Sequence, residues 1–122
     1  MIRGLGVDVV EVDRIRRAVS RWGEPFLCRI FTPRELSRRT SLAAAEHFAG
    51  RFAAKEAVMK ALGAGRAGLG WQEIEITTDA SGRPGVFLSG RAEERANRLG
   101  VRAWQIAISH SRLVAIAQAL AE

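Results

Sequence analysis

The first third of the chain changes from a strand-like to a helix-like hydrophobic pattern. Apolar residues at every second position near the start predict a strand over residues 2–10. Helical spacing follows in the apolar set Val12, Ile15, Val19 and Trp22. This spacing predicts a first helix that ends near residues 23–25, where glycine and proline favour a break. Thr32, followed by proline and then by Glu35 three residues after the threonine, predicts a second, short helix with a capping box.

The longest predicted helix covers residues 41–62 and ends at Gly63. Its apolar stripe comprises Phe48, Phe52, Met59 and Leu62. Lys55 and Glu56 lie at or beside the edge of this stripe. Residues 63–70 contain many glycines, which tolerate unusual backbone dihedrals, so we expect a loop there.

Strands dominate the remainder of the chain. The pattern predicts them over residues 72–78, 85–89, 101–109 and 113–120. A turn joins the first two into a hairpin, and a helix over residues 92–99 precedes the last two. This order predicts an α+β fold in which one long helix packs against a largely antiparallel sheet.

Length and composition favour one domain over residues 1–122, because 48% hydrophobic content in so short a chain suits a single core. The chain has no run of about 20 apolar residues, and its first residues lack the layout of a signal peptide. We therefore expect a soluble, cytoplasmic protein that does not enter membranes. Cys28, the single cysteine, cannot form an internal disulfide and is expected to be a small buried side chain.

Arginine supplies most of the formal net charge of +6, since Lys55 and Lys60 are the only lysines. The arginines are crowded over residues 14–39, where Glu24 and Glu35 are the only acidic residues. Such a charge attracts an acidic partner, which could be nucleic acid, a phosphorylated ligand or an acidic protein. A solvated basic face without a partner is the alternative.

Two carboxylates occupy positions that call for a partner. Asp8 lies within a strand, where aspartate is unfavourable and an ionised carboxylate is costly to bury alone. Glu56 lies on the long helix one turn before Lys60, and a surface ion pair between them is one interpretation. The other is a Mg²⁺ site, because this ion needs few protein carboxylates and takes waters and substrate phosphates as its remaining ligands. Arg51, Lys55 and Lys60 could then receive the phosphates.

Two segments resemble the signature blocks of the holo-acyl-carrier-protein synthases, a family of short phosphopantetheinyl transferases. They are GLGVDVVE at residues 4–11 and RFAAKEAVMKALG at residues 51–63. The resemblance covers essentially the whole chain and includes residues 71–76, 82–84 and 108–111. One departure is Ala107, where the family usually has a serine.

The resemblance implies a Mg²⁺-dependent transfer of 4'-phosphopantetheine from coenzyme A to a serine of an apo-acyl carrier protein, with release of adenosine 3',5'-bisphosphate, in support of fatty acid biosynthesis. Asp8 and Glu56 match the metal-binding carboxylates of the family, and Lys60 matches the lysine near the coenzyme A diphosphate. The family binds the phosphates and adenosine part of coenzyme A at positions that match Arg51, Gly63, Gly65, Pro84, Ser109 and His110. A metal-bound water or Glu56 could accept the serine proton, and Lys60 could stabilise the departing phosphate. The resemblance also implies a homotrimer with active sites between subunits.

The first helix offers a docking face for an acidic carrier protein. Arg14, Arg17 and Arg21 are three and four residues apart, so they lie on one side of this helix. Trp22 and nearby apolar residues could extend the contact, although burial in the protein's own core is the favoured interpretation.

Two other functions are weighed against the transferase. An arginine-rich nucleic-acid-binding module is disfavoured, because aromatic residues are not interleaved with the basic run and no binding motif is recognised. A non-catalytic coenzyme A-binding protein is disfavoured because Asp8, Glu56 and Lys60 are all present. Taken alone, His110 fits a turn histidine with a satisfied hydrogen bond better than a phosphate or catalytic contact.

Overall fold

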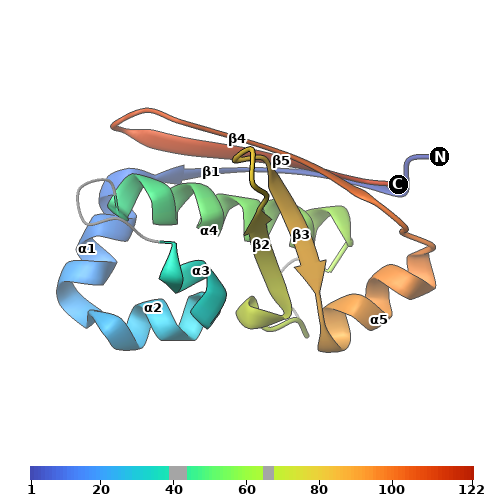
Figure 1. Ribbon diagram of the computed structural model, residues 1–122, viewed down its shortest axis with the longest axis horizontal. Helices are drawn as coiled ribbons and strands as arrows, with labels where there is room; N and C mark the ends of the chain where they lie inside the picture. Colours follow the sequence, from blue (N-terminus) through green and yellow to red (C-terminus); the bar gives the residue numbers. More distant parts are fainter. Residues whose placement is uncertain (39–43, 65–67) are drawn as a thin grey trace.

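Figure 1 shows a computed structural model of the chain, which describes residues 1–38, 44–64 and 68–122. The helices are α1 (Val12–Trp22), α2 (Glu24–Ile30), α3 (Pro33–Ser37), α4 (Ala44–Ala61) and α5 (Gly90–Leu99). The strands are β1 (Gly4–Glu11), β2 (Ile74–Thr78), β3 (Pro84–Leu88), β4 (Trp104–His110) and β5 (Val114–Ala121). None of the helices in these ranges combines the length and hydrophobicity needed to cross a bilayer.

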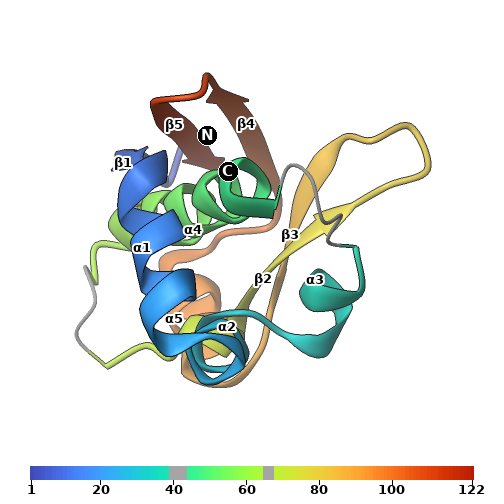
Figure 2. The same ribbon diagram turned by 90° about the vertical axis from the view of Figure 1, so that its left-hand side faces the viewer.

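A three-stranded sheet lies along α4. Its order is β1-β5-β4 and both pairings are antiparallel, whereas β2 and β3 form a separate antiparallel hairpin. Helices α1 to α3 gather beside one end of α4, and α5 lies towards the other end (Figure 1). The hairpin projects away from α1 (Figure 2). The predicted α+β class, with antiparallel pairing and one long helix against a sheet, is confirmed, and the strands are divided between two sheets.

Small residues allow α4 to approach the sheet closely. A Cβ added to Gly4 or Gly6 on β1 would overlap the backbone carbonyl of Ala61 or Ala57 on α4, so β1 and α4 are in near backbone contact. The inward side chains of β5 are likewise alanines, at positions 115, 117, 119 and 121, and all are buried. This close packing fixes the position and rotation of α4 relative to the sheet, and with them the contacts that its side chains make.

Several local predictions agree with the structure, and others need correction. Thr32 and Glu35 form the expected capping box, in which the Glu35 backbone N–H donates to Thr32 Oγ1 at 3.2 Å. The strand expected from residue 72 begins at Ile74, because the preceding residues form a 3₁₀ turn. The start of the long helix, predicted at residues 41–43, lies outside the described residues. Cys28 is exposed rather than buried, because α2 turns Leu27 and Ile30 towards the core instead.

Candidate active site

The junction of β1 and α4 brings together two of the predicted site residues. The Lys60 ammonium donates to Asp8 Oδ1 at 3.1 Å and to the Val7 carbonyl oxygen at 3.1 Å. The side chain of Asp8 is 14% exposed, whereas that of Lys60 is 50% exposed. Strand alternation explains the position of Asp8, since it shares the inward face of β1 with Gly6 and therefore faces α4. The carboxylate of Asp8 therefore has the charged partner that was expected from its position within a strand.

Glu56 belongs to the same side of α4. It precedes Lys60 by one helical turn, and it is partly buried. The junction therefore has one carboxylate on the strand, one on the helix, and a half-exposed lysine side chain one turn beyond the second carboxylate.

This donor set suits Mg²⁺ with substrate oxygens, and it does not suit a metal held by protein alone. Within the described ranges, no group of three or more histidine, cysteine, aspartate or glutamate side chains could hold a metal ion. Asp8 and Glu56 offer hard oxygen donors, and Mg²⁺ is commonly bound by one or two carboxylates, phosphate oxygens and water. The two carboxylates therefore suit an ion whose remaining ligands are supplied by a phosphorylated substrate.

A second group of predicted residues lines a pocket of about 320 Å³ between α4, the β2–β3 turn and β4. Its lining residues are Arg51, Gly82, Pro84, Ile106, Ala107, Ile108 and His110. Arg51 donates to Thr78 Oγ1 at 3.2 Å, and burial lowers the pKa of its guanidinium below the ordinary value. Because an arginine remains protonated after such a change, the pocket keeps a cation fixed in its wall.

The two groups lie at different levels of α4. Arg51 and Lys60 are nine residues apart, which corresponds to about 14 Å at about 1.5 Å per residue along the helix. A ligand that reaches both groups must therefore be extended, or the groups must meet across two copies of the chain.

Ser109 does not share the pocket with His110. Successive residues of β4 point to opposite sides of the sheet, and Ser109 lines a shallow hollow of about 150 Å³ on the outer face with Val7, Ala107 and Ile116. Gly63 follows the end of α4 with a φ of 70°, a conformation that favours glycine. Gly65 lies outside the described residues.

The prediction that Lys55 receives phosphate is wrong, because its side chain is enclosed by the protein. Its side chain is fully buried, and its ammonium donates to Glu35 Oε1 at 2.7 Å and to the carbonyl oxygens of Trp71 at 3.1 Å and Ile74 at 2.6 Å. An ammonium group has three N–H donors, and these three acceptors match them. Burial lowers the pKa of Lys55, and the carboxylate of Glu35 opposes that change. Lys55 therefore ties α4 to α3 and β2 and does not receive phosphate.

The three arginines of the proposed docking face are exposed on α1. Arg17 lies 3.3 Å from Asp13, and the guanidinium of Arg21 lies 4.9 Å from the ring centroid of Trp22. Trp22 is 58% exposed, which corrects the expectation that it is buried in the core. With Pro25, Phe26 and Arg29 it lines an open hollow of about 470 Å³ between α1 and α2.

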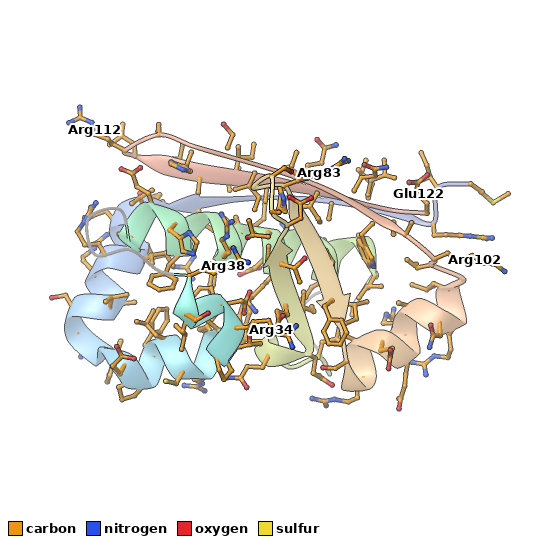
Figure 3. The ribbon with its side chains drawn as sticks, viewed as in Figure 1. Arg34, Arg38, Arg83, Arg102, Arg112 and Glu122 are labelled. Atoms are coloured by element: carbon orange, nitrogen blue, oxygen red, sulfur yellow. The ribbon has the colours of Figure 1, made fainter. Side chains whose placement is uncertain are left out.

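Other arginines are distributed over separate surfaces. Figure 3 shows Arg34 and Arg38 near α3, while Arg102 and Arg112 lie at opposite ends of the molecule. Arg34 is 3.5 Å from Glu75 on β2. The excess of positive charge is therefore not one continuous strip, and α1 provides a compact group of arginines.

Two residues in the first turn of α4, Glu46 and His47, contact or neighbour the predicted site but were not predicted from the sequence. His47 is half-buried, and burial, followed by the nearby positive charges of Arg51 and His110, lowers its pKa from 6.5 to about 4. Glu46 Oε2 lies 3.1 Å from His110 Nδ1. The only sequence signal was the spacing of His47 and Arg51, which are four residues apart and so share a side of the helix.

Comparison with known proteins defines the class to which this fold and site belong. Residues 4–116 match the 4'-phosphopantetheinyl transferase superfamily, and the chain belongs to that superfamily of enzymes. A holo-[acyl-carrier-protein] synthase of Solidesulfovibrio magneticus is 50% identical over 100% of this chain and 99% of the relative. The corresponding enzyme of Herpetosiphon aurantiacus is 47% identical over 92% of both chains.

Solved structures show the same likeness over the full fold. The holo-[acyl-carrier-protein] synthase of Neisseria meningitidis has a TM-score of 0.89 at 35% identity, and the match covers 100% of this chain and 99% of that one. The Helicobacter pylori enzyme, solved in complex with coenzyme A, has a TM-score of 0.84 at 30% identity, with 97% and 99% covered.

Proposed function

We propose that this chain, as one domain over residues 1–122, transfers 4'-phosphopantetheine from coenzyme A to a serine of an apo-acyl carrier protein and releases adenosine 3',5'-bisphosphate. The observation that carries the proposal is the pairing of Asp8 with Lys60, beside Glu56, in a fold shared with holo-acyl-carrier-protein synthases. The coenzyme A complex of the Helicobacter pylori relative supports the choice of donor. We place the reaction in the cytoplasm, in the supply of carrier protein for fatty acid synthesis, and the exposed free thiol of Cys28 suits a reducing compartment.

The side chains at the β1–α4 junction account for the chemistry. The serine oxygen forms a bond to the phosphorus that bears the pantetheine arm, and the bond from that phosphorus to the departing bisphosphate breaks. Glu56, or a water beside it, accepts the serine proton. The side chain of Lys60 is half-exposed, so its ammonium group can stabilise negative charge on the departing phosphate. Mg²⁺, when bound by Asp8 and Glu56, supplies further neutralisation of the diphosphate.

The pocket between α4, the β2–β3 turn and β4 is proposed to hold the phosphates and adenosine part of coenzyme A. Arg51 provides a fixed cation, and Pro84 and His110 line the wall beside it. Gly63 would provide close backbone approach at the end of α4, because glycine has no side chain and its positive φ there is a conformation that favours glycine.

The acyl carrier protein is proposed to dock on α1. Arg14, Arg17 and Arg21 present positive charge to an acidic helix, and the adjacent hollow beside Trp22 can take an apolar side chain from the same partner. A charged rim next to an exposed aromatic residue is a common arrangement at protein interfaces.

We further propose a homotrimer assembled through the outer face of the three-stranded sheet. Apolar side chains on that face are exposed in the single chain, and they include Leu5, Val7, Val9, Val114 and Ile116. An apolar face of this kind marks an interaction surface, and a second copy of the chain offers matching chemistry. Such contacts would let Asp8 of one subunit work with the Arg51 and His110 pocket of its neighbour.

Mixing two impaired variants, one in the chemical step and one in coenzyme A binding, tests the shared site. Asp8→Ala and His110→Ala subunits, unfolded together and refolded, should regain activity at limiting coenzyme A, because some interfaces then combine both intact residues. Random mixing predicts that about one quarter of the sites become active. Mixed subunits that form trimers without regaining activity would show that each site lies within one chain.

The transfer itself is tested by mass spectrometry of apo-acyl carrier protein incubated with coenzyme A and Mg²⁺. The carrier protein should gain the mass of one phosphopantetheine group, and chelation of the metal should stop the gain. Asp8→Ala and Glu56→Ala should abolish transfer while circular dichroism shows a folded protein, and Lys60→Ala should mainly lower kcat. No mass gain with the folded, unmodified protein would refute the proposed function.

A further inference from the structure

Glu46 and His110 form a pair at the edge of the proposed coenzyme A pocket. Glu46 Oε2, in the first turn of α4, lies 3.1 Å from Nδ1 of His110, the last residue of β4. The side chains are 27% and 44% exposed, respectively, so the contact lies at the border of the protein rather than in open solvent. His110 also lines the pocket that contains Arg51 and Pro84.

The register between α4 and β4 places these two side chains together. Gly50 lies one turn after Glu46 on the same side of α4, and a Cβ there would be 2.9 Å from Ile108 Cγ2. Ile108 precedes His110 by two residues, so both point to the same face of β4. The close approach of Gly50 to Ile108 therefore sets the spacing at which Glu46 meets His110.

Glu46 leaves only one ring nitrogen of His110 for a ligand. A carboxylate accepts but does not donate, so the Glu46 contact requires the proton on Nδ1. His110 lines the pocket, so Nε2 is the ring nitrogen left to meet a ligand there. His47, the next residue on α4, is kept neutral at neutral pH by a pKa lowered to about 4, so it does not compete for Glu46 as a cation.

We propose that Glu46 is a positioning residue: it holds the His110 ring through Nδ1 so that Nε2, the remaining acceptor of the ring, accepts a hydrogen bond from an amino or hydroxyl group of the adenosine part of coenzyme A. This inference rests on the proposed function of the Arg51 pocket. It assigns to Glu46 a role in binding, because the pocket lies about 14 Å along α4 from Lys60, where the reacting phosphorus would lie. Loss of the contact should therefore weaken coenzyme A binding without slowing the chemical step.

Steady-state kinetics with three variants test the role of Glu46. Glu46→Ala should raise KM for coenzyme A about fivefold to tenfold, the effect of losing one polar contact of ordinary strength, with kcat within about twofold. Glu46→Gln keeps an oxygen that can accept from Nδ1, so it should recover part of the affinity. Glu94→Ala removes an exposed carboxylate on α5 and should leave both constants unchanged.

Nitrogen NMR of the imidazole ring in the ligand-free protein provides a readout that does not need activity. The unmodified protein should carry the His110 proton on Nδ1, and Glu46→Ala should shift the neutral ring towards the Nε2-protonated tautomer. An unchanged tautomer together with an unchanged KM would overturn the inference, as would an equal loss of kcat in the Ala and Gln variants. Absence of transfer in the unmodified enzyme would instead refute the proposed function, and the NMR comparison would still decide whether Glu46 orients His110.

Discussion

The buried ammonium of Lys55 provides a direct test of how the site is divided between binding and architecture. Lys55→Met keeps the length of the side chain and removes the charge. The change leaves the carboxylate of Glu35 buried without its cation, although the backbone N–H groups of Thr32 and Ile76 still donate to it at 2.9 Å. The carbonyl oxygens of Trp71 and Ile74 also lose a donor.

The expected loss of stability is large because the pair is dry. Lys55 and Glu35 side chains are 0% and 2% exposed, and removing one partner of such a pair costs about 3 to 5 kcal/mol. For a chain of this size each kcal/mol lowers Tm by about 3 to 6 °C, so Tm should fall by about 10 to 30 °C. Domains of this kind commonly have about 5 to 15 kcal/mol of stability, so the variant should remain folded in the cold.

Thermal unfolding and cold steady-state kinetics are the paired assays. Lys55→Met should unfold earlier yet keep the KM for coenzyme A, because the ammonium is buried and all three of its N–H groups donate within the protein. The double variant with Glu35→Gln should lose less stability than the sum of the two single variants, because it no longer buries an unpaired charge. A Lys55→Met protein with an unchanged Tm and a KM raised more than tenfold would refute the structural role and return Lys55 to the ligand site.

Three further perturbations follow from the packing and the charges. Gly6→Ala should cost more than about 3 kcal/mol in urea unfolding, because its Cβ overlaps the α4 backbone. Gly50→Ala places its Cβ 2.9 Å from a side-chain methyl group of Ile108, which can shift more readily than backbone, and should cost about 1 to 2 kcal/mol. Equal losses would contradict the close approach of β1 to α4. The pKa of His47 is lowered to about 4 in the folded protein, so as pH falls the histidine of the unfolded chain is protonated before that of the folded chain. The free energy of unfolding at neutral pH should therefore decline as pH falls from 6.5 to about 4. After allowance for partial exposure this amounts to about 1 to 2 kcal/mol, and a His47→Gln variant with the same decline would disprove it. Reversing Arg14 and Arg21 to glutamate should lower kcat/KM for the carrier protein about tenfold at low salt, with the KM for coenzyme A unchanged. The difference in kcat/KM between the unmodified and reversed proteins should shrink as salt is added. If the reversal leaves kcat/KM for the carrier protein unchanged, α1 is excluded as the docking face.

Features set by neighbouring residues could be predicted from the sequence. The capping box of Thr32 and Glu35 depends on a spacing of three residues, and the structure forms both of its hydrogen bonds. Gly100 ends α5 with a φ of 78°, as glycine after a helical pattern predicts. The separate helix α2 is less visible, because Gly23 breaks the helix but a helical course resumes at once after it. Each of these depends on backbone preference and short-range hydrogen bonds, which the local sequence contains.

The burial of a side chain and the residues with which it pairs depend on segments that are distant in sequence. Lys55 and Lys60 lie on one helix, yet the first is enclosed by Glu35, 20 residues away, and the second reaches Asp8, 52 residues away. Nothing in the helical pattern distinguishes a lysine that faces α3 and β2 from one that faces β1.

The sequence alone therefore determined which carboxylate, ammonium and guanidinium side chains the site contains. It also determined the strand and the helices on which they lie. The assignment of Lys55 to the core, of Ser109 and His110 to opposite faces of β4, and of Glu46 to His110 was decided only by tertiary structure. The physical reason is that the surface a side chain meets depends on the rotation of its helix and the register of its sheet. Both are fixed here by the near backbone contact of α4 with β1 and by the close approach of Gly50 to Ile108.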